Sequence, residues 1–253
     1  MNLNSINQQS IKKANRQFYD AIAKNYEEID GRRSPGLESW LHLNLINIRK
    51  RCSGGNLLDI GSGSGLVTRC SQDLFKLRVS LDISEKILIS SHDSFDSGIV
   101  ADIDHLPFAA HSFDLITCFS VLHHLYSFEP LILEVSRVLK PGGIFYSDHD
   151  LDKRFNERFH LPFFLYRRLH NAKYRYMRIS DKITPELYNL TEWQQKGIDS
   201  EYLVSLFRKE GFSLEYHFHW FGLSFFSDML FAKRNYSYGW APLLSLLAVK
   251  KDG

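Results

Sequence analysis

The sequence predicts an α/β fold in which helices cover both faces of a largely parallel sheet. Short apolar strands alternate with helical segments from about residue 55 to residue 148, which is typical of a doubly wound sheet. The first of these strands runs directly into a glycine-rich turn, and a helix follows that turn. At 253 residues the chain can bury the core of one such domain together with an insertion.

Two helices are predicted before the first strand. Residues 10–28 have the spacing of an amphipathic helix, and residues 36–51 form a second helical segment. The apolar face of the first helix consists of Ile11, Ala14, Phe18 and Ile22. Tyr19 and Tyr26 lie on the same helix, where they either contact a ligand or only pack.

The first strand, residues 56–60, leads into glycines at positions 61, 63 and 65. Glycines let backbone N–H groups and a helix N-terminus approach a ligand closely, because no Cβ intervenes. The dinucleotide fingerprint would need a glycine where this chain has Leu66. Asp59 precedes the turn, and its carboxylate suits an ammonium group better than a pyrophosphate. A purely structural turn is the alternative.

Acidic residues follow the next two strands. Residues 77–81 end at Asp82, about 20 residues after the glycines, where nucleotide-binding α/β folds place the carboxylate for the ribose. Residues 99–101 end at Asp102 and Ile103. The remaining predicted elements of this part are a strand at 113–118, a helix at 129–139 stopped by Lys140-Pro141-Gly142-Gly143, and a strand at 143–147.

Residues 152–196 interrupt the alternation. Between 152 and 178 there are eight Lys or Arg, Arg167 and Arg168 among them, against the two acids Asp152 and Glu157. Aromatic residues are interleaved with them. We predict a helical insertion that forms a lid over the ligand crevice; a solvated basic face and a membrane-surface contact are the alternatives. A helix at 199–210, capped by Asp199 and Gly211, and strands at 212–220 and 243–250 complete the chain.

Taken in order, these motifs resemble the class I S-adenosylmethionine-dependent methyltransferases, in particular the small-molecule branch that includes quinone and sterol methyltransferases. The resemblance covers about residues 55–150. It implies a Rossmann-like doubly wound sheet of seven strands in the order 3-2-1-4-5-7-6, with the last strand antiparallel. The implied single domain consists of N-terminal cap helices (1–54), a cofactor-binding core (55–150), a helical lid after strand 5 (151–197) and the C-terminal part of the sheet (198–253).

The resemblance also assigns S-adenosylmethionine-binding roles. The methionine end would be held by the turn, namely by Gly61, Ser62, Gly63 and Gly65, with Asp59 orienting it. Asp82 would accept the ribose hydroxyls, with Ile83 beside the adenine. Asp102 would reach the adenine amino group, and Ile103 would pack on the ring. The other implied contacts are Cys118, Phe119 and Ser120 on the sulfonium side, and Tyr19 and Tyr26 on the cap.

A general base is needed only if the acceptor is protonated at neutral pH, as an alcohol or phenol is. The candidates are His149, which lies between two aspartates at the end of the fifth strand, and His123 and His124 after the fourth. Each of them has a structural role as its alternative.

Composition narrows the function further. The formal net charge of +2 gives no reason to expect a nucleic-acid partner. The three cysteines are odd in number and lack metal-ligand spacing, so we predict a reducing, cytoplasmic setting and no metal site. No signal peptide or transmembrane segment is expected, and a peripheral membrane contact is left open.

The sequence therefore predicts methyl transfer to a small molecule, which would be aromatic, lipid-like or a natural product. The lid's basic residues favour an anionic group on it. Methylation of a protein or another macromolecule is one alternative. A subunit that binds the nucleoside cofactor without turnover is another. The acceptor, the atom methylated and the oligomeric state are left open.

Overall fold

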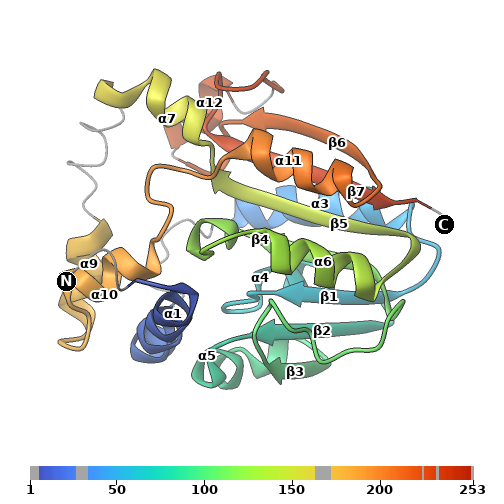
Figure 1. The fold of residues 1–253 in the computed structure, drawn as a ribbon, viewed down its shortest axis with the longest axis horizontal. Coiled ribbons are helices and arrows are strands. Elements are labelled where there is room, and N and C mark those ends of the chain that lie inside the picture. Colours follow the sequence, from blue (N-terminus) through green and yellow to red (C-terminus); the bar gives the residue numbers. More distant parts are fainter. Residues whose placement is uncertain (1–5, 27–33, 163–171, 224, 232–233, 252–253) are drawn as a thin grey trace.

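A seven-stranded sheet with the order β3-β2-β1-β4-β5-β7-β6 forms the centre of the molecule (Figure 1). Strands β1 to β5 pair in parallel, whereas β7 pairs antiparallel with both β5 and β6. The computed structural model describes residues 6–26, 34–162, 172–223, 225–231 and 234–251. The strands are β1 (Asn56–Ile60), β2 (Leu77–Asp82), β3 (Ser97–Val100), β4 (Phe113–Phe119), β5 (Leu139–Leu151), β6 (Phe212–His219) and β7 (Leu243–Lys250).

Helices cover both faces of the sheet. One hydrophobic core joins α6 and α11 to one face, and a second core joins α3 and α4 to the other. The helices are α1 (Gln8–Ile22), α3 (Pro35–Arg49), α4 (Leu66–Cys70), α5 (Glu85–Ser90), α6 (Glu129–Val138), α7 (Lys153–Arg158), α9 (Ala172–Ile179), α10 (Pro185–Thr191), α11 (Ser200–Lys209) and α12 (Phe225–Phe231). Short 3₁₀ turns lie at η2 (Ala23–Asn25), η3 (His92–Ser94) and η4 (Leu122–His124).

Local sequence sets several helix starts. The side chains of Asn7, Ser34 and Asp199 accept backbone N–H groups from the first turns of α1, α3 and α11. Asp152 and Thr184 cap α7 and α10 in the same way. These caps define where the chain turns back toward the sheet.

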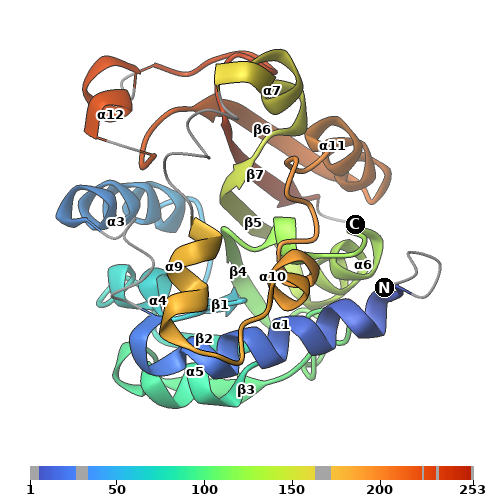
Figure 2. The same ribbon diagram turned by 90° about the vertical axis from the view of Figure 1, so that its left-hand side faces the viewer.

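The carboxyl ends of the parallel strands face a layer formed by α1, α9 and α10. Figure 2 shows these three helices side by side across that edge. A third hydrophobic cluster holds them together, in which Phe18 and Ile22 of α1 pack with Ile183, Tyr176 and Tyr188. Segments that are far apart in the sequence thus form one wall above the glycine turn.

The predicted strand order and the antiparallel last strand are confirmed. The fifth strand is longer than predicted, since it spans Leu139–Leu151. It pairs with β4 as far as Asp148 and with β7 as far as Leu151, with an irregularity in the β7 pairing between Asp148 and Asp150. The first helix ends at Ile22, where the backbone tightens into η2, and the last residues of the predicted helix, 27 and 28, lie outside the described residues. Helix α12 was not predicted. Arg167 and Arg168 lie outside the described residues.

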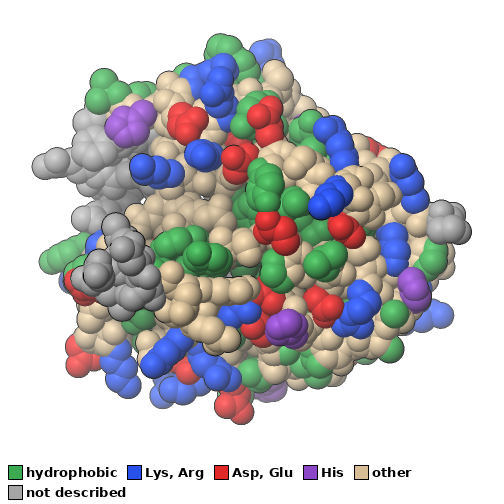
Figure 3. Space-filling view, viewed as in Figure 1, with side chains coloured by type: hydrophobic (Ala, Val, Ile, Leu, Met, Phe, Trp, Pro, Cys, Tyr) green, Lys and Arg blue, Asp and Glu red, His purple; other side chains and the backbone are tan. Residues whose placement is uncertain are grey.

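Acidic and basic side chains are interspersed over the face that α6 and α11 present (Figure 3). Within the described ranges, we find no helix with the length and hydrophobicity needed to cross a bilayer.

Candidate active site

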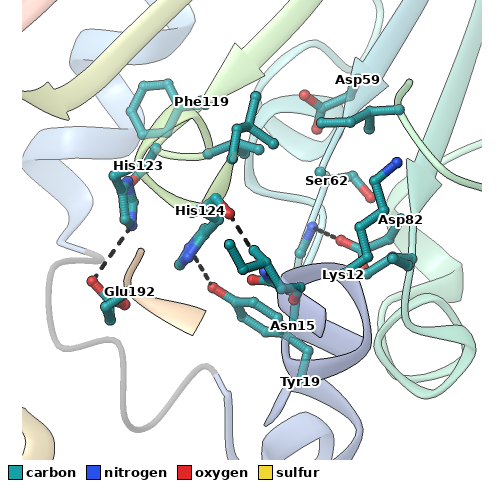
Figure 4. Close-up of a pocket in the computed structure, with 18 of the residues that line it drawn as sticks. Lys12, Asn15, Tyr19, Asp59, Ser62, Asp82, Phe119, His123, His124 and Glu192 are labelled. Carbon is teal, nitrogen blue, oxygen red and sulfur yellow. Dashed lines mark hydrogen bonds and ion pairs between the residues drawn. The ribbon is translucent and has the colours of Figure 1, made fainter. Parts of the chain in front are cut away.

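A cavity opens at the carboxyl edge of the sheet, between the turns that follow β1, β2 and β4 and the overlying helix α1 (Figure 4). It brings together the predicted site residues except Gly65 and Cys118. Those that line it are Tyr19, Tyr26, Asp59, Gly61, Ser62, Gly63, Asp82, Ile83, Asp102, Ile103, Phe119, Ser120, His123, His124 and His149.

The turn leaves little space for a side chain at its glycine positions. Gly61 and Gly63 have φ angles of +66° and +52°, which favour glycine. A Cβ on Gly61 would lie 2.6 Å from Val121, and one on Gly63 would lie 3.1 Å from the Tyr26 ring. Gly65 is not a cavity residue, since a Cβ there would lie 2.5 Å from Ser94 instead. Gly65 therefore serves the packing of the turn.

Asp59 presents a buried carboxylate at the base of the cavity. Thr117 donates to its Oδ1 at 2.7 Å, whereas nothing in the described part of the chain hydrogen-bonds to its Oδ2. Burial raises the pKa of Asp59 to about 7. The Oγ of Ser62, also on the cavity wall, likewise has no partner among the described residues. An ammonium group would satisfy the carboxylate, so these atoms fit the amino-acid end of S-adenosylmethionine.

Asp82 ties the turn to the second strand. Its two carboxylate oxygens accept the N–H groups of Gly63 at 3.1 Å and Ser84 at 2.9 Å. Burial raises its pKa to about 6. A carboxylate has about four lone-pair sites, so Asp82 retains acceptor capacity toward the cavity, which fits a ribose.

Helix α1 supplies polar residues that the sequence reasoning missed. Lys12 donates to Asp102 at 2.5 Å and also pairs with Asp104, to which Gln8 donates. Asn15 donates to the Ile11 carbonyl in its own helix. Lys12, Gln8 and Asn15 line the cavity. Lys12 lies on the polar face of the predicted helix, whereas Gln8 precedes that helix and Asn15 is buried on its apolar face, so no pattern in the sequence pointed to the three together.

Cys118 is fully buried and belongs to the hydrophobic core between the sheet and α6. Successive side chains of a strand point to opposite faces. The side chain of Cys118 is therefore held in the core, while its neighbour Phe119 reaches the cavity. The predicted sulfonium-side wall thus consists of Phe119 and Ser120 without Cys118.

His149 belongs to a buried polar network that is centred on Asp148. Its Nδ1 lies 2.7 Å from Asp148 Oδ1, and His219 Nε2 lies 2.8 Å from the same oxygen. Burial alone would raise the pKa of Asp148, but His219 and His149 together lower it. His149 also has an unusual φ of +68° and stacks on Phe119 with 4.5 Å between ring centroids. This network holds the Nδ1 edge of His149, a residue of the cavity wall, against the Asp148 carboxylate.

His124 connects helix α1 to the end of helix α10. Its Nδ1 lies 2.7 Å from the Thr191 carbonyl, so Nδ1 carries the hydrogen and Nε2 accepts from the Tyr19 hydroxyl at 2.8 Å. Burial, with a further contribution from His123, lowers the pKa of His124 to about 4. A neutral His124 with both nitrogens engaged joins α1 to α10.

His123 is held by Asp150. That carboxylate accepts from the backbone N–H of His123 at 3.1 Å and lies 2.7 Å from its Nδ1. The Nε2 of His123 is 3.8 Å from Glu192, a residue of the insertion that also lines the cavity. Of the three predicted histidines, His149 and His123 each have Nδ1 within 2.7 Å of an aspartate carboxylate.

Comparison with known proteins bears on the fold and on residues 58–147. Residues 58–147 match the model of the family described as "Methyltransferase domain". The chain is 36% identical over 105 residues to an uncharacterized chloroplastic methyltransferase of Arabidopsis thaliana, covering 36% of this chain and 30% of the relative. It is 27% identical over 133 residues to a ubiquinone biosynthesis O-methyltransferase of Xanthomonas axonopodis, covering 49% of this chain and 56% of that one. The chain thus spans about a third to just over half of these relatives.

The fold has close counterparts among solved structures. One is a structure titled as a SAM-dependent methyltransferase and possible histamine N-methyltransferase from Thermotoga maritima. It superimposes with a TM-score of 0.60 at 18% identity and covers 92% of this chain and all (100%) of its own. This likeness concerns the fold. Residues 58–147, which match the methyltransferase-domain model, form the core of this Rossmann-like fold.

Proposed function

We propose that this chain transfers a methyl group from S-adenosylmethionine to a hydroxyl of a small aromatic or otherwise apolar acceptor. The observation that carries the proposal is the composition of the cavity. A glycine turn with two buried carboxylates forms one side, and an imidazole resting on a buried aspartate lies on the other. The first half suits the cofactor, and the second suits an acceptor that must lose a proton.

Bound S-adenosylmethionine supplies an electrophilic methyl group on a sulfonium. In this proposal the chain positions both reactants, with Asp59 and Asp82 fixing the two ends of the cofactor. The Nδ1 edge of His149 faces Asp148, and in this proposal its Nε2 accepts the acceptor's hydroxyl proton. Asp148 then stabilises the imidazolium that forms. His124 is the weaker base candidate, because both of its nitrogens already hold neighbours.

Aromatic side chains support an apolar acceptor. Phe119 stacks on His149, and Trp40 packs edge-on against the same imidazole with 5.3 Å between centroids. Tyr176 and Leu37 line the same cavity. A flat or apolar acceptor would gain contact area on these rings. The quinone-pathway name of one relative is consistent with such an acceptor.

We also propose that the insertion works as a lid within a single domain. Tyr176 of α9 and Glu192, directly after α10, reach the cavity, and both helices pack on α1. The division into cap helices (1–54), core (55–150), insertion (151–197) and C-terminal strands (198–253) is part of this proposal. A contact between the insertion and a membrane surface stays a prediction. An exposed leucine, Leu161, beside the basic helix α7 would suit such a contact.

The test is release of S-adenosylhomocysteine with a panel of phenols, quinols and aliphatic alcohols, each with and without a carboxylate. We expect turnover with at least one phenolic or quinol acceptor, and loss of turnover in His149→Ala with cofactor affinity kept. Binding of the cofactor without turnover on any acceptor would favour the non-catalytic subunit. Turnover only with added protein would favour a macromolecular substrate.

A further inference from the structure

Three side chains with metal-ligating atoms meet on the wall of the cavity. His123 and His124 belong to η4, and Glu192 follows the last turn of α10. One potential ligand atom from each lies within 4.8 Å of the other two. His123 Nε2 lies 3.8 Å from Glu192 Oε2. Figure 4 shows His123 facing Glu192 across this part of the cavity.

Each of the two imidazoles is oriented by an acceptor behind it. Asp150 lies 2.7 Å from His123 Nδ1, and the Thr191 carbonyl lies 2.7 Å from His124 Nδ1. A carboxylate or carbonyl on one ring nitrogen fixes the tautomer and leaves the lone pair on the other nitrogen. Metal-binding histidines almost always have such a partner. In this tautomer both Nε2 atoms carry the lone pair that a metal ion needs.

A second group of this kind, Asp148 with His149 and His219, lacks that preparation. His219 accepts from the Phe221 N–H through Nδ1 at 3.2 Å, so its Nε2 must carry a hydrogen toward Asp148. Neither nitrogen of His219 offers a lone pair to an ion. The comparison singles out the cluster around Glu192.

We propose that His123, His124 and Glu192 bind a divalent transition-metal ion of the Zn²⁺ type, at the edge of the cavity between the core and the insertion. Two imidazoles and one carboxylate match the three-ligand sets of zinc sites that keep one position open. Binding would replace the bond from the Tyr19 hydroxyl to His124 Nε2 and draw the ligand atoms together, since Zn–N distances are about 2.0–2.1 Å. The ion would then tie the insertion to the core.

The role of the open position rests on the proposed function. An ion there could bind the acceptor's hydroxyl oxygen and lower its pKa, so that proton transfer to His149 becomes easier. Binding of the ion itself does not depend on methyl transfer and is tested without cofactor or acceptor.

The experiment titrates Co²⁺ alone into the purified, metal-free full chain and follows its visible absorption, with Zn²⁺ calorimetry in parallel. We expect one ion per chain. Glu192→Gln and His123→Ala should each weaken binding at least tenfold, and Asp150→Asn should weaken it about 10–100-fold through its hold on His123. Tyr19→Phe should keep or tighten binding, because it frees His124 Nε2.

His92→Ala is the matched control, because this histidine is exposed on η3, away from the cavity. It should leave the affinity unchanged. Absence of stoichiometric binding to the wild-type chain would overturn the proposal, as would binding that Glu192→Gln and His123→Ala leave intact. If His123→Ala does not fold, the near-isosteric Glu192→Gln decides. Metal binding without methyl transfer would contradict the proposed function alone, and transfer without metal binding would contradict only this inference.

Discussion

Replacing Asp59 by Asn isolates the charge at the base of the cavity. Burial raises the pKa of Asp59 from its ordinary 3.8 to about 7, so the folded chain binds a proton there more tightly than the unfolded chain. Each pH unit between those values corresponds to about 1.36 kcal/mol. Ionised Asp59 therefore costs the ligand-free fold about 4 kcal/mol above pH 7, and this cost disappears as the pH falls through 7 toward 4.

Asparagine carries no charge and keeps an oxygen for the Thr117 hydroxyl, but its buried amide would cost about 1–3 kcal/mol for want of an acceptor. We therefore expect Asp59→Asn to raise the free energy of unfolding of the ligand-free protein by about 1–3 kcal/mol at pH 8. At pH 4 the advantage should vanish or reverse. The same variant should bind S-adenosylmethionine at least tenfold more weakly at pH 8, because the ammonium loses its counter-charge.

Urea unfolding at pH 8 and pH 4, with wild type and variant side by side, measures the first effect. Calorimetry with S-adenosylhomocysteine measures the second. The reasoning is refuted if the stability difference between the two proteins is the same at both pH values. It is also refuted if the variant binds the cofactor as tightly as wild type.

Three further predictions concern the same cavity. Gly63→Val should abolish cofactor binding, because its Cβ would lie 3.1 Å from the Tyr26 ring at a φ of +52°; normal calorimetric binding by a folded variant would leave the turn a structural role only. Asp82→Ala should weaken cofactor binding by roughly 2–4 kcal/mol, counting about 1–2 for each charge-assisted bond, and an unchanged affinity would remove Asp82 from the site. His149→Ala should slow transfer to a hydroxyl acceptor by about 10²-fold or more at constant cofactor affinity; an unchanged rate would point to positioning or to His123.

The cofactor half of the cavity could be predicted because its signals are local. Asp59 and the glycines occupy one strand and its turn, and Asp82 ends the next strand of the same sheet. The carboxyl ends of parallel strands meet at one edge, so spacing along the chain translates directly into proximity. The alternation of strand and helix segments predicted the strands themselves. Their order in the sheet was predicted only from the family resemblance.

The cap and acceptor sides depend on contacts between distant segments. Periodicity shows which face of α1 is apolar, but not that its Lys12 meets Asp102, 90 residues away. The polar run from Asp148 to Asp150 looks like the end of a strand. Pairing with β7 instead extends β5 through it and buries all three side chains. Glu192 had no local signal at all, because its partners lie in another part of the fold.

Helix α1 is held over the cavity by its buried apolar face and by polar side chains, including Lys12 at one end and the Tyr19–His124 bond at the other. No strand pairing holds it, and the ion pairs of Lys12 are partly exposed and therefore open to screening by salt. Both the apolar packing and these polar contacts would have to break for the helix to leave the cavity. Exchange of spent cofactor for fresh would depend on how often this helix swings away. The rate of turnover would then be set by the motion of helix α1 rather than by the chemical step.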